Sequence, residues 1–441
     1  MDDVEMERLL ELLRIPSISA DPAHEGDMLR AAEMVADEVR RAGGTADVVS
    51  TSGHPLVVGE VPPSDDSPAA PVVTIYGHYD VQPAGDLALW TSPPFQPEIR
   101  EGMVFARGAT DDKGNMFMLL VALQRLRAEG RLTVRARILI DGEEESGGHS
   151  AVDFIEAEAK PARAALIFDS PMIGPRRPAV CTGLRGLAYF RVRVRGGEAD
   201  LHSGMYGGAA LNSIHALMQV LHAVVMRDGR VPEPLLDGAP EPTSAEVDAW
   251  ATLPGGDELL AQAGGRPLDA RAVQEYRRRT TMLPSVDVHG IRAGDPSLVA
   301  TVIPAVAEAT VSCRIPPGAD ADHLAQVMRE LMQAACPAGA GVEVEGLGVA
   351  GSSRLDPGAP VIAAAMRGIT EGTGLEVTPL GIGGSIPVVA AMAARGTSVV
   401  LSGFGLPDDG LHAPDEHMRL ENLDLGVKGA MGILCALGEL A

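Results

Sequence analysis

The sequence predicts an α/β fold in two parts: a mixed, mostly parallel sheet between helices, interrupted by a smaller α+β domain of two layers. Short apolar runs typical of buried strands alternate with helical patterns in the first and last parts of the chain. Near residue 186 this pattern gives way to strands with one polar face. Hydrophobic residues make up 46% of the 441, which suffices for two or three domains with sizeable cores.

The first part alternates helix and strand signals. Apolar residues from Met28 to Val39 recur at helical spacing, and the Gly43-Gly44 pair ends that helix. Another helix is expected after Gly114. The expected buried strands are residues 72–76, 134–140 and 164–168. Because strands joined by helices run parallel and end at one edge of the sheet, ligands are expected at that edge.

The middle part is interpreted as an inserted domain. Arg191, Arg193 and Arg195 alternate with apolar residues, which indicates a strand with one wet face. The elements that follow are expected at residues 209–226 (a largely apolar helix), 285–291, 309–315, 321–335 (a helix) and 342–347. This β-α-β-β-α-β order is typical of a small two-layer domain. The expected domain segments are 1–186 and 353–441 for the larger domain and 187–352 for the insertion, with 228–268 as a Pro- and Gly-rich addition.

The charge of the chain argues against two classes of partner. Lys and Arg total 36 and Asp and Glu total 60, a net charge of −24, so neither nucleic acid nor an anionic membrane is expected as a partner. No apolar window of about 18 residues predicts a transmembrane helix. The N-terminus, MDDVEMERLLELLR, is acidic and unlike a signal peptide, so a cytoplasmic location is expected. The four cysteines form no Cys-x-x-Cys pair and are interpreted as reduced and buried.

Acidic residues and histidines gather where the expected strands end. His78 and Asp80 follow the first strand, and the period of two makes their side chains point the same way. A carboxylate beside a metal-binding histidine orients the ring. Taken alone, such a His-x-Asp is more often surface decoration.

Two acidic loops follow. The loop RGATDDKG (107–114) could simply cap the helix after it. The loop DGEEESGG (141–148) could be a solvated loop, although carboxylates beside a buried strand are costly unless they are paired. Adjacent residues point in different directions, so one glutamate of this run can ligate a metal while its neighbour addresses a bound water.

Asp169 follows the strand at 164–168, and His412 lies in GLHAPDE (410–416). Each of them alone is more often structural than functional. Three separate strands nevertheless deliver an acid or a histidine to the same end of one sheet. Mixed nitrogen and oxygen ligands suit zinc, with manganese or cobalt as alternatives.

Together these motifs resemble the aminoacylase, carnosinase and succinyl-diaminopimelate desuccinylase family of co-catalytic zinc metallopeptidases. The resemblance runs over almost the whole chain. It rests on GHYDVQP (77–83), WTSPPFQPEI (90–99), ARGATDDKG (106–114), DGEEESGG (141–148), DLHSGMYGG (200–208), TVIP (301–304), GGSIP (383–387) and LHAPDE (411–416). HYDVQP, PSVDVHGI (284–291), DLHSGMYGG and the long insertion are most like the carnosinase-like dipeptidase branch.

The resemblance implies a zinc-peptidase-like catalytic domain with an inserted lid and dimerisation domain, and two divalent ions per chain, with zinc as the expected metal. One ion would be held by His78, Asp111 and Asp169, and the other by Asp111, Glu145 and His412, with Asp111 bridging. Asp80 would orient His78, and Glu144 would be the general base. The resemblance also implies a cis peptide bond between Asp111 and Asp112.

Residues of the inserted domain and the GGSIP loop receive roles from the same resemblance. His202 would reach the metal site of a neighbouring subunit as an oxyanion donor, which implies a homodimer. Arg314 and Thr301 would hold the substrate, with Arg314 suited to a bidentate grip on a C-terminal carboxylate. Gly384 and Ser385 would lie beside it. Many relatives carry a charged pair before GGSIP, whereas this chain has LGI (380–382), which leaves the side-chain specificity of that loop open.

The predicted function is hydrolysis of the amide bond of dipeptides or short peptides by metal-activated water. The alternatives are an N-acyl amino acid deacylase or desuccinylase on the same scaffold and a non-catalytic metal-binding relative. Retention of Glu144 with a full ligand set argues against the latter. The expected partners are a small peptide or N-acyl amino acid and a second copy of the chain. The helix at 209–226, apolar on nearly every side, would leave apolar surface exposed unless that copy covers it.

Overall fold

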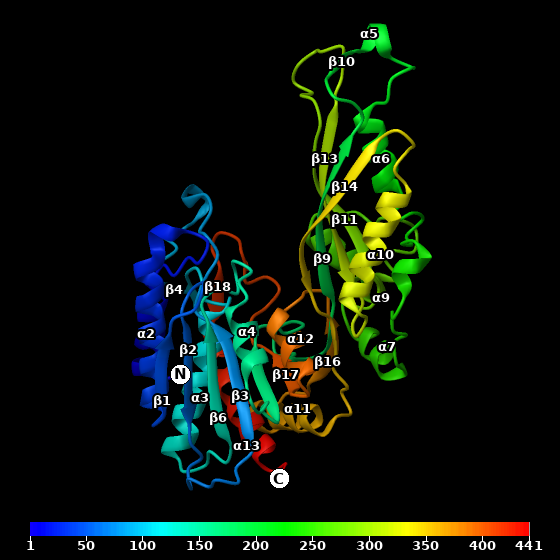
Figure 1. The fold of residues 1–441 in the computed structure, drawn as a ribbon. Helices are drawn as coiled ribbons and strands as arrows, with labels where there is room; N and C mark the ends of the chain where they lie inside the picture. Colours follow the sequence, from blue (N-terminus) through cyan, green and yellow to red (C-terminus); the bar gives the residue numbers. More distant parts are fainter. Residues whose placement is uncertain (441) are drawn as a thin grey trace. The chain divides into compact units, whose positions relative to one another are not determined.

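The structure, a computed structural model, describes residues 1–440 and divides into two compact units (Figure 1). Unit 1 comprises Met1–Thr182, Leu355–Leu380 and the residues from Ala391 onward. Unit 2 comprises Gly183–Arg354 and Gly381–Ala390. The observed boundaries lie within a few residues of the expected ones, with one difference. The segment Gly381–Ala390 was expected in the larger domain, but it clusters with unit 2 because Arg185 and Arg314 hydrogen-bond to it.

The core of unit 1 is a six-stranded sheet in the order β1-β2-β6-β3-β7-β17. Its strands are β1 (Thr45–Val49), β2 (Leu56–Val61), β3 (Val72–His78), β6 (Arg135–Asp141), β7 (Ala164–Phe168) and β17 (Ser398–Ser402). β6, β3, β7 and β17 run parallel, whereas β1 and β2 extend one edge antiparallel. The expected mixed, mostly parallel sheet is therefore confirmed, and four carboxyl ends meet at one edge of it.

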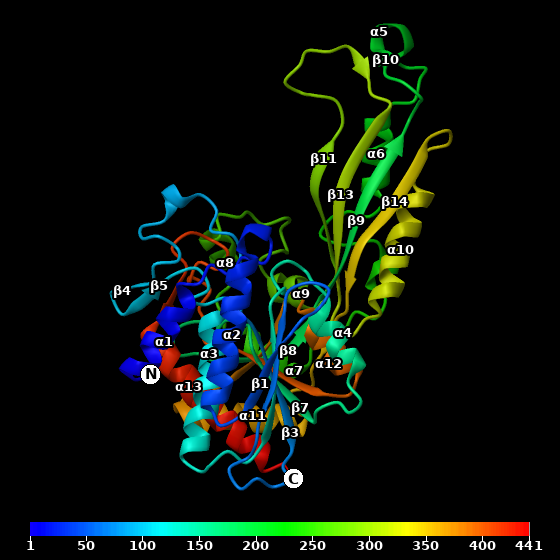
Figure 2. The ribbon, with the colours of Figure 1, turned by 60° about the vertical axis from the view of Figure 1, so that its left-hand side comes forward.

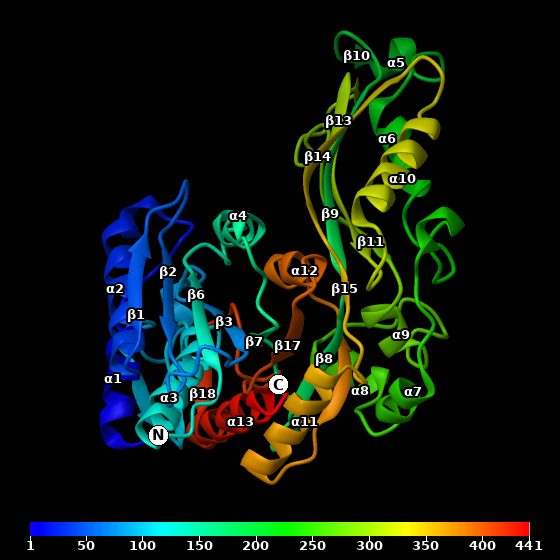
Figure 3. The same ribbon diagram turned by 60° about the horizontal axis from the view of Figure 1, so that its bottom comes forward.

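Helices lie on both faces of this sheet (Figure 3). α3 (Lys113–Ala128) packs on β3 and β7, and it is buried almost all round because α1 (Asp3–Leu13) and α13 (Leu420–Gly438) cover its outer side. α4 (Ser150–Ala157) packs against β6. The other helices of unit 1 are α2 (Glu25–Arg41) and α11 (Pro360–Thr373), and α12 (Pro387–Ala394) begins in unit 2 and ends in unit 1. α11 and α13 cross so closely that a Cβ atom on Gly432 would lie 2.0 Å from the carbonyl oxygen of Gly368.

A small antiparallel sheet brings two distant loops of unit 1 together. β18 (His417–Arg419) pairs with β5 (Met103–Phe105), which in turn pairs with β4 (Glu98–Arg100). Because His417 lies opposite Phe105, the loop before β18 is held beside the loop after β5. These are the loops that carry His412 and Asp111.

Unit 2 is built on an antiparallel sheet in the order β11-β13-β9-β14, with α6 and α10 packed on it (Figure 2). Its elements in chain order are β9 (Gly186–Arg195), α6 (Ser213–His222), β11 (Ser285–Arg292), β13 (Val306–Ile315), α10 (Ala321–Ala334) and β14 (Gly341–Ala350). The expected β-α-β-β-α-β order is therefore confirmed. Val192 and Val311 are buried in the core with the helices, whereas Arg191 and Arg193 are exposed. A further sheet contains β8 (Ala179–Leu184), β15 (Ser353–Arg354) and β16 (Thr378–Ile382).

The helix expected at 209–226 is wrong in extent. α6 begins only after Asn212, whose side chain accepts a hydrogen bond from Ile214 N (2.9 Å) and so caps the helix. It ends at His222, and the chain then turns back through Gly229, which has a positive φ of 71°. Its apolar residues are mostly buried, with Met218 as the exposed exception. The added segment carries short helices: η3 (Glu233–Leu236), α7 (Ser244–Trp250), α8 (Gly256–Gln262) and α9 (Tyr276–Thr281).

Exposed apolar side chains gather instead in residues 201–206 and 298–303, which we call the β10–β12 tip. β10 (Leu201–His202) pairs with β12 (Val302–Ile303), and α5 (Ser203–Tyr206) follows β10 (Figure 1). Its exposed apolar side chains are Met205, Tyr206, Leu298, Val299 and Val302. The exposed apolar surface that the sequence placed on the helix at 209–226 is therefore found on the tip, and the homodimer stays a prediction. No helix among residues 1–440 is long and apolar enough to cross a membrane.

Candidate metal centre

The residues predicted as metal ligands lie at the carboxyl edge of the unit 1 sheet. His78 is the last residue of β3, and Asp169 directly follows β7. Asp111 precedes α3, Glu145 lies in the loop after β6, and His412 lies in the loop before β18. The peptide bond between Asp111 and Asp112 is cis, as expected.

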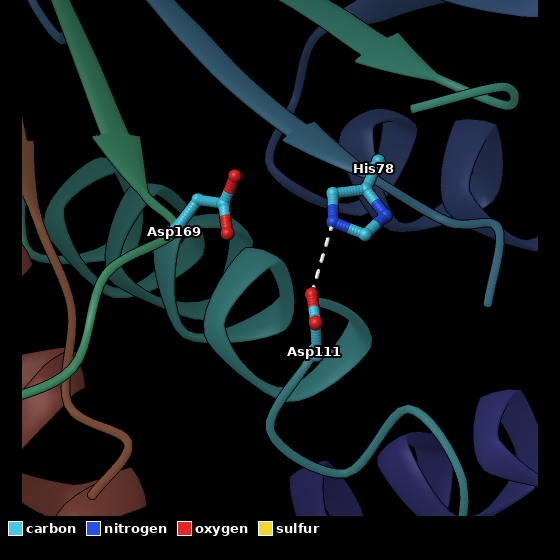
Figure 4. A group of neighbouring side chains, drawn as sticks. All are labelled: His78, Asp111 and Asp169. Carbon is cyan, nitrogen blue, oxygen red and sulfur yellow. Dashed lines mark ion pairs between the residues drawn. The ribbon is translucent and has the colours of Figure 1, made fainter. Parts of the chain in front are cut away.

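The first group consists of His78, Asp111 and Asp169. One ligand atom from each lies within 4.8 Å of the others, and Nε2 of His78 lies 3.3 Å from Oδ1 of Asp111. Figure 4 shows the three side chains approaching one another from two strand ends and the loop before α3. His78 is buried, and the two carboxylates are nearly so.

The second group consists of Asp111, Glu145 and His412, again with ligand atoms within 4.8 Å of one another. Nε2 of His412 lies 2.9 Å from Oδ2 of Asp111 and 3.3 Å from Oε1 of Glu145. Asp111 therefore belongs to both groups and offers a different oxygen to each. This arrangement suits a carboxylate shared by two cations.

Two ligand atoms in these groups test whether a cation fits. Nε2 of His78 and Oε1 of Glu145 are buried, and among the described residues each has only an ion-pair contact at 3.3 Å, with Asp111 Oδ1 and His412 Nε2 respectively, and no hydrogen bond of good geometry. Leaving a buried polar atom without a partner costs about 1–3 kcal/mol, more for a charged group. A divalent cation would provide the missing partner, and the mixed nitrogen and oxygen donors match those that zinc accepts. The residues present fit the metal that the sequence implies.

The proton affinities of the ligands agree with this fit. Burial raises the pKa of Asp111, but the hydrogen bond with His412 and the ion-pair contact with His78 outweigh it and lower the pKa overall. Burial raises the pKa of Asp169 well above its usual range. The hydrogen bond with Asp111, followed by the ion-pair contact with Glu145, raises the pKa of His412 to about 10. The histidine protons partly offset the charge of the carboxylates, and a cation would replace them.

The three consecutive glutamates have different surroundings. Glu143 accepts hydrogen bonds from His54 N (2.9 Å) and Ser150 N (2.7 Å), so it holds the loop in place. Glu145 accepts a hydrogen bond from Gln82 Nε2 (2.9 Å). No hydrogen bond from the described residues engages the Glu144 side chain, and burial raises its pKa to about 7. A carboxylate with such a pKa is suited to accept a proton near neutral pH.

Asp80 joins two of the site loops. Its Oδ1 lies 3.3 Å from Nδ1 of His78, and its Oδ2 accepts a hydrogen bond from Glu145 N (3.0 Å). It is fully buried. Asp80 is thus placed to fix the ring of one ligand and the backbone of another.

A buried ion pair between Arg107 and Glu416 was not predicted from the sequence. Both are buried, and Arg107 Nη1 donates to Glu416 Oε2 (2.7 Å). The same carboxylate accepts hydrogen bonds from the backbone N–H groups of Gly108, Thr110 and Asp111, each at 3.0 Å. Glu416 therefore fixes the loop that carries Asp111. Both residues lie in motifs that resemble the family. They are 309 residues apart, however, and a contact between residues so distant leaves no local pattern in a single sequence.

The remaining predicted residues lie in unit 2, in two places. Arg314 Nη1 donates to Ser385 Oγ (3.2 Å), and Gly384 is exposed beside Ser385. His202 and Thr301 lie on the β10–β12 tip, where the Thr301 carbonyl accepts a hydrogen bond from Ser203 N (2.8 Å). The His202 side chain is exposed and accepts a hydrogen bond from Gly204 N (3.1 Å).

The chain matches known proteins over most of its length. A model of peptidase family M20/M25/M40 matches residues 74–435. A cysteinylglycine-S-conjugate dipeptidase of Corynebacterium striatum is 28% identical over 430 residues, which cover 93% of this chain and 90% of that protein. The Beta-Ala-His dipeptidase of Homo sapiens is 27% identical over 435 residues, covering 93% and 85%.

A solved structure has the same fold throughout. The M20 family metallo-carboxypeptidase Sso-CP2 from Sulfolobus solfataricus is 26% identical and superposes with a TM-score of 0.87, covering 100% of both chains. The likeness spans both units, so the inserted domain is part of the shared fold.

Proposed function

The chain belongs to peptidase family M20/M25/M40, and on this premise we propose that it is a dinuclear metal-dependent hydrolase that cleaves the amide bond of dipeptides. The observation that carries the proposal is Asp111, which offers one carboxylate oxygen to each of two ligand groups. The similarity to two dipeptidases over 93% of the chain supports the choice of substrate.

His78, Asp111 and Asp169 would hold one ion, and Asp111, Glu145 and His412 the other. Zinc is the metal we expect. When bound, such ions lower the pKa of a water toward about 7 and polarise the scissile carbonyl. Asp80 keeps the His78 ring in place, and Glu416 keeps the Asp111 loop in place.

Glu144 is the proposed general base. It takes a proton from the attacking water and delivers it to the leaving amine. Its raised pKa supports this role, as does the lack of a hydrogen bond from the described residues that would tie its side chain down. Glu143 and Glu145 are both held by other groups, so Glu144 is the member of the run that remains available.

Arg314 is the proposed site for the free carboxylate of the dipeptide, next to Ser385 and Gly384. His202 is proposed to donate a hydrogen bond to the oxyanion, with Thr301 beside it. Between Val306 and Arg314, β13 is continuous, and eight residues at about 3.3 Å each span about 26 Å. His202 lies beyond the Val306 end of β13, since it pairs with Val302 and Ala305 N donates to Asp200 Oδ1 (2.8 Å). An extended dipeptide spans only about 7 Å, so His202 and Arg314 of one chain cannot both touch it.

This geometry supports a homodimer in which His202 acts on the substrate of the partner subunit. The exposed apolar side chains of the β10–β12 tip lie next to His202 and would be covered by a second copy. A small peptide and a second copy of the chain are therefore the proposed partners. A cytoplasmic location stays a prediction.

A substrate panel tests the proposed function. Protein reconstituted with zinc would be given dipeptides, longer peptides, and N-acetyl and N-succinyl amino acids, with Glu144→Gln as the inactive control. We expect cleavage of dipeptides and two equivalents of metal by elemental analysis. Preferred cleavage of the N-acyl amino acids would favour the deacylase alternative. If the wild-type protein binds only one equivalent of metal per chain, and Asp111→Ala binds the same amount, the dinuclear assignment is contradicted.

A further inference from the structure

We propose that Arg185 is a positioning and specificity-determining residue, a second cation that sets the preference of the Arg314 site for substrates with a free carboxylate. This inference rests on the proposed function and adds to it a residue to which neither the sequence motifs nor the comparisons give a role. Arg185 lies in unit 2 together with Arg314, Gly383 and Ser385.

Arg185 ties together three segments of unit 2. Its Nε donates to the Gly383 carbonyl (3.2 Å). Its Nη1 donates to the carbonyls of Arg279 and Leu283, both at 3.3 Å, and to Ser285 Oγ (3.2 Å). The side chain is only 8% exposed, so the guanidinium is a fixed part of the interior.

The GGSIP loop is fitted to this guanidinium. A Cβ atom on Gly383 would lie 2.5 Å from the Thr280 carbonyl oxygen and 3.1 Å from Arg185 Nη2. Only glycine allows the loop to approach so closely. The loop that carries Ser385 therefore takes its position from Arg185.

Ser385 connects the two arginines. Its hydroxyl donates to the Arg185 carbonyl oxygen (2.5 Å) and accepts from Arg314 Nη1 (3.2 Å). The orientation of Arg314 thus depends on the Ser385 hydroxyl. This hydroxyl is held by the Arg185 carbonyl and by the contact of the Arg185 guanidinium with Gly383 in the same loop. Loss of the Arg185 side chain releases the loop and, with it, this support for Arg314.

The two guanidiniums lie near each other with little negative charge beside them: Asp287 is close enough to raise the pKa of Arg185, but it forms no ion pair with that side chain. All the hydrogen-bond acceptors of Arg185 named above are neutral, and no described carboxylate forms an ion pair with Arg185 or with Arg314. Burial, followed by the nearby Arg314 charge, lowers the pKa of Arg185 to about 10, so both remain cationic at neutral pH. Buried charges are normally paired. A carboxylate bound at Arg314 would supply the ion-pair partner that neither arginine has among the described residues.

The test compares a dipeptide with the same dipeptide amidated at its C-terminus, in the zinc-loaded enzyme and its Arg185→Met variant. The readout is the ratio of kcat/KM for the two substrates. Because the same folded molecules cleave both, partial misfolding leaves the ratio unchanged. We expect this ratio to fall about tenfold to a hundredfold in Arg185→Met, which is the effect of losing a hydrogen bond to a charged group. The fall should come mainly from a higher KM for the dipeptide with the free carboxylate.

Arg191→Met is the matched control, since this exposed arginine of β9, the strand that Arg185 directly precedes, pairs with Glu345 (2.8 Å). Its ratio should equal that of the wild type. Arg185→Lys keeps the positive charge but not the several N–H donors of the guanidinium, and it should give an intermediate ratio. If Arg185→Met yields no active enzyme, the ratio of Arg185→Lys is the test. A wild-type ratio in the Arg185 variants overturns the inference. A wild-type enzyme that cleaves no dipeptide overturns the proposed function instead.

Discussion

The candidate metal centre of unit 1 and the proposed oxyanion donor on the tip of unit 2 differ in how the surrounding structure holds them. In unit 1 each candidate ligand lies at a strand end or in a loop that buried partners hold, such as Asp80 for His78 and Glu416 for Asp111. On the β10–β12 tip, His202 is exposed among apolar side chains. The candidate ligands are therefore held by partners within one chain, whereas the proposed role of His202 as an oxyanion donor depends on the proposed second copy.

The largest expected effect is a loss of turnover that distinguishes two neighbouring residues of the candidate metal centre, Glu144 and Glu145. Glu144→Gln should keep both metals but reduce turnover by about 10²–10⁴, because it removes a general base and leaves the ligands intact. Glu145→Gln should lose metal as well, since it belongs to a ligand group. Steady-state kinetics and elemental analysis on both variants check this. Exchanged phenotypes would show that the roles within the glutamate run are shifted by one residue.

The next effect concerns the tip. His202→Ala should reduce turnover by about 10²–10³, the usual effect of losing one oxyanion donor, without loss of metal. Mixing His202→Ala with Glu144→Gln under subunit exchange should restore activity, because a mixed dimer has one site with both defects and one with neither. If exchange is demonstrated and activity does not return, His202 does not act in trans.

A third variant weakens the support that distinguishes unit 1. Glu416→Gln removes the charge that Arg107 and the Asp111 loop contact, and it should lower metal affinity by about 10–100-fold. Breaking this buried pair should also destabilise the fold by about 3–5 kcal/mol. Metal titration and chemical denaturation measure both effects. The control is Glu421→Gln, which removes an exposed partner of Arg176 and should cost less than about 1 kcal/mol. Equal effects in both variants would contradict the role of Glu416.

The smallest effect is the pH dependence of metal affinity. The pKa of His412 is raised to about 10, so below that pH the imidazole carries a proton that a metal ion must displace. Affinity should therefore rise with pH, by up to about tenfold per unit for each proton released, and the His412 contribution should end near pH 10. Calorimetry in buffers of different ionisation enthalpy counts the released protons. His412→Ala should release fewer protons, and an unchanged count would contradict this assignment.

Local patterns predicted much of the architecture. The strand at 164–168 matches β7, and the inserted β-α-β-β-α-β order matches unit 2, because period and composition are local properties. Element ends were less predictable. The helix expected at 209–226 extended too far because apolar content alone does not reveal the Asn212 cap or the turn at Gly229.

The chain by itself determined the residue types of the candidate metal centre, since acids and histidines directly follow apolar strands in sequence. Only the tertiary structure decided which of them meet. The pairing of β18 with β5 brings the His412 loop to Asp111, and the burial of Glu416 with Arg107 fixes the Asp111 loop. The tertiary structure also decided that Gly381–Ala390 belongs to unit 2, where the Gly383 carbonyl accepts a hydrogen bond from Arg185. These contacts join residues hundreds of positions apart, and their energy depends on burial and exact distance, which a linear pattern does not encode.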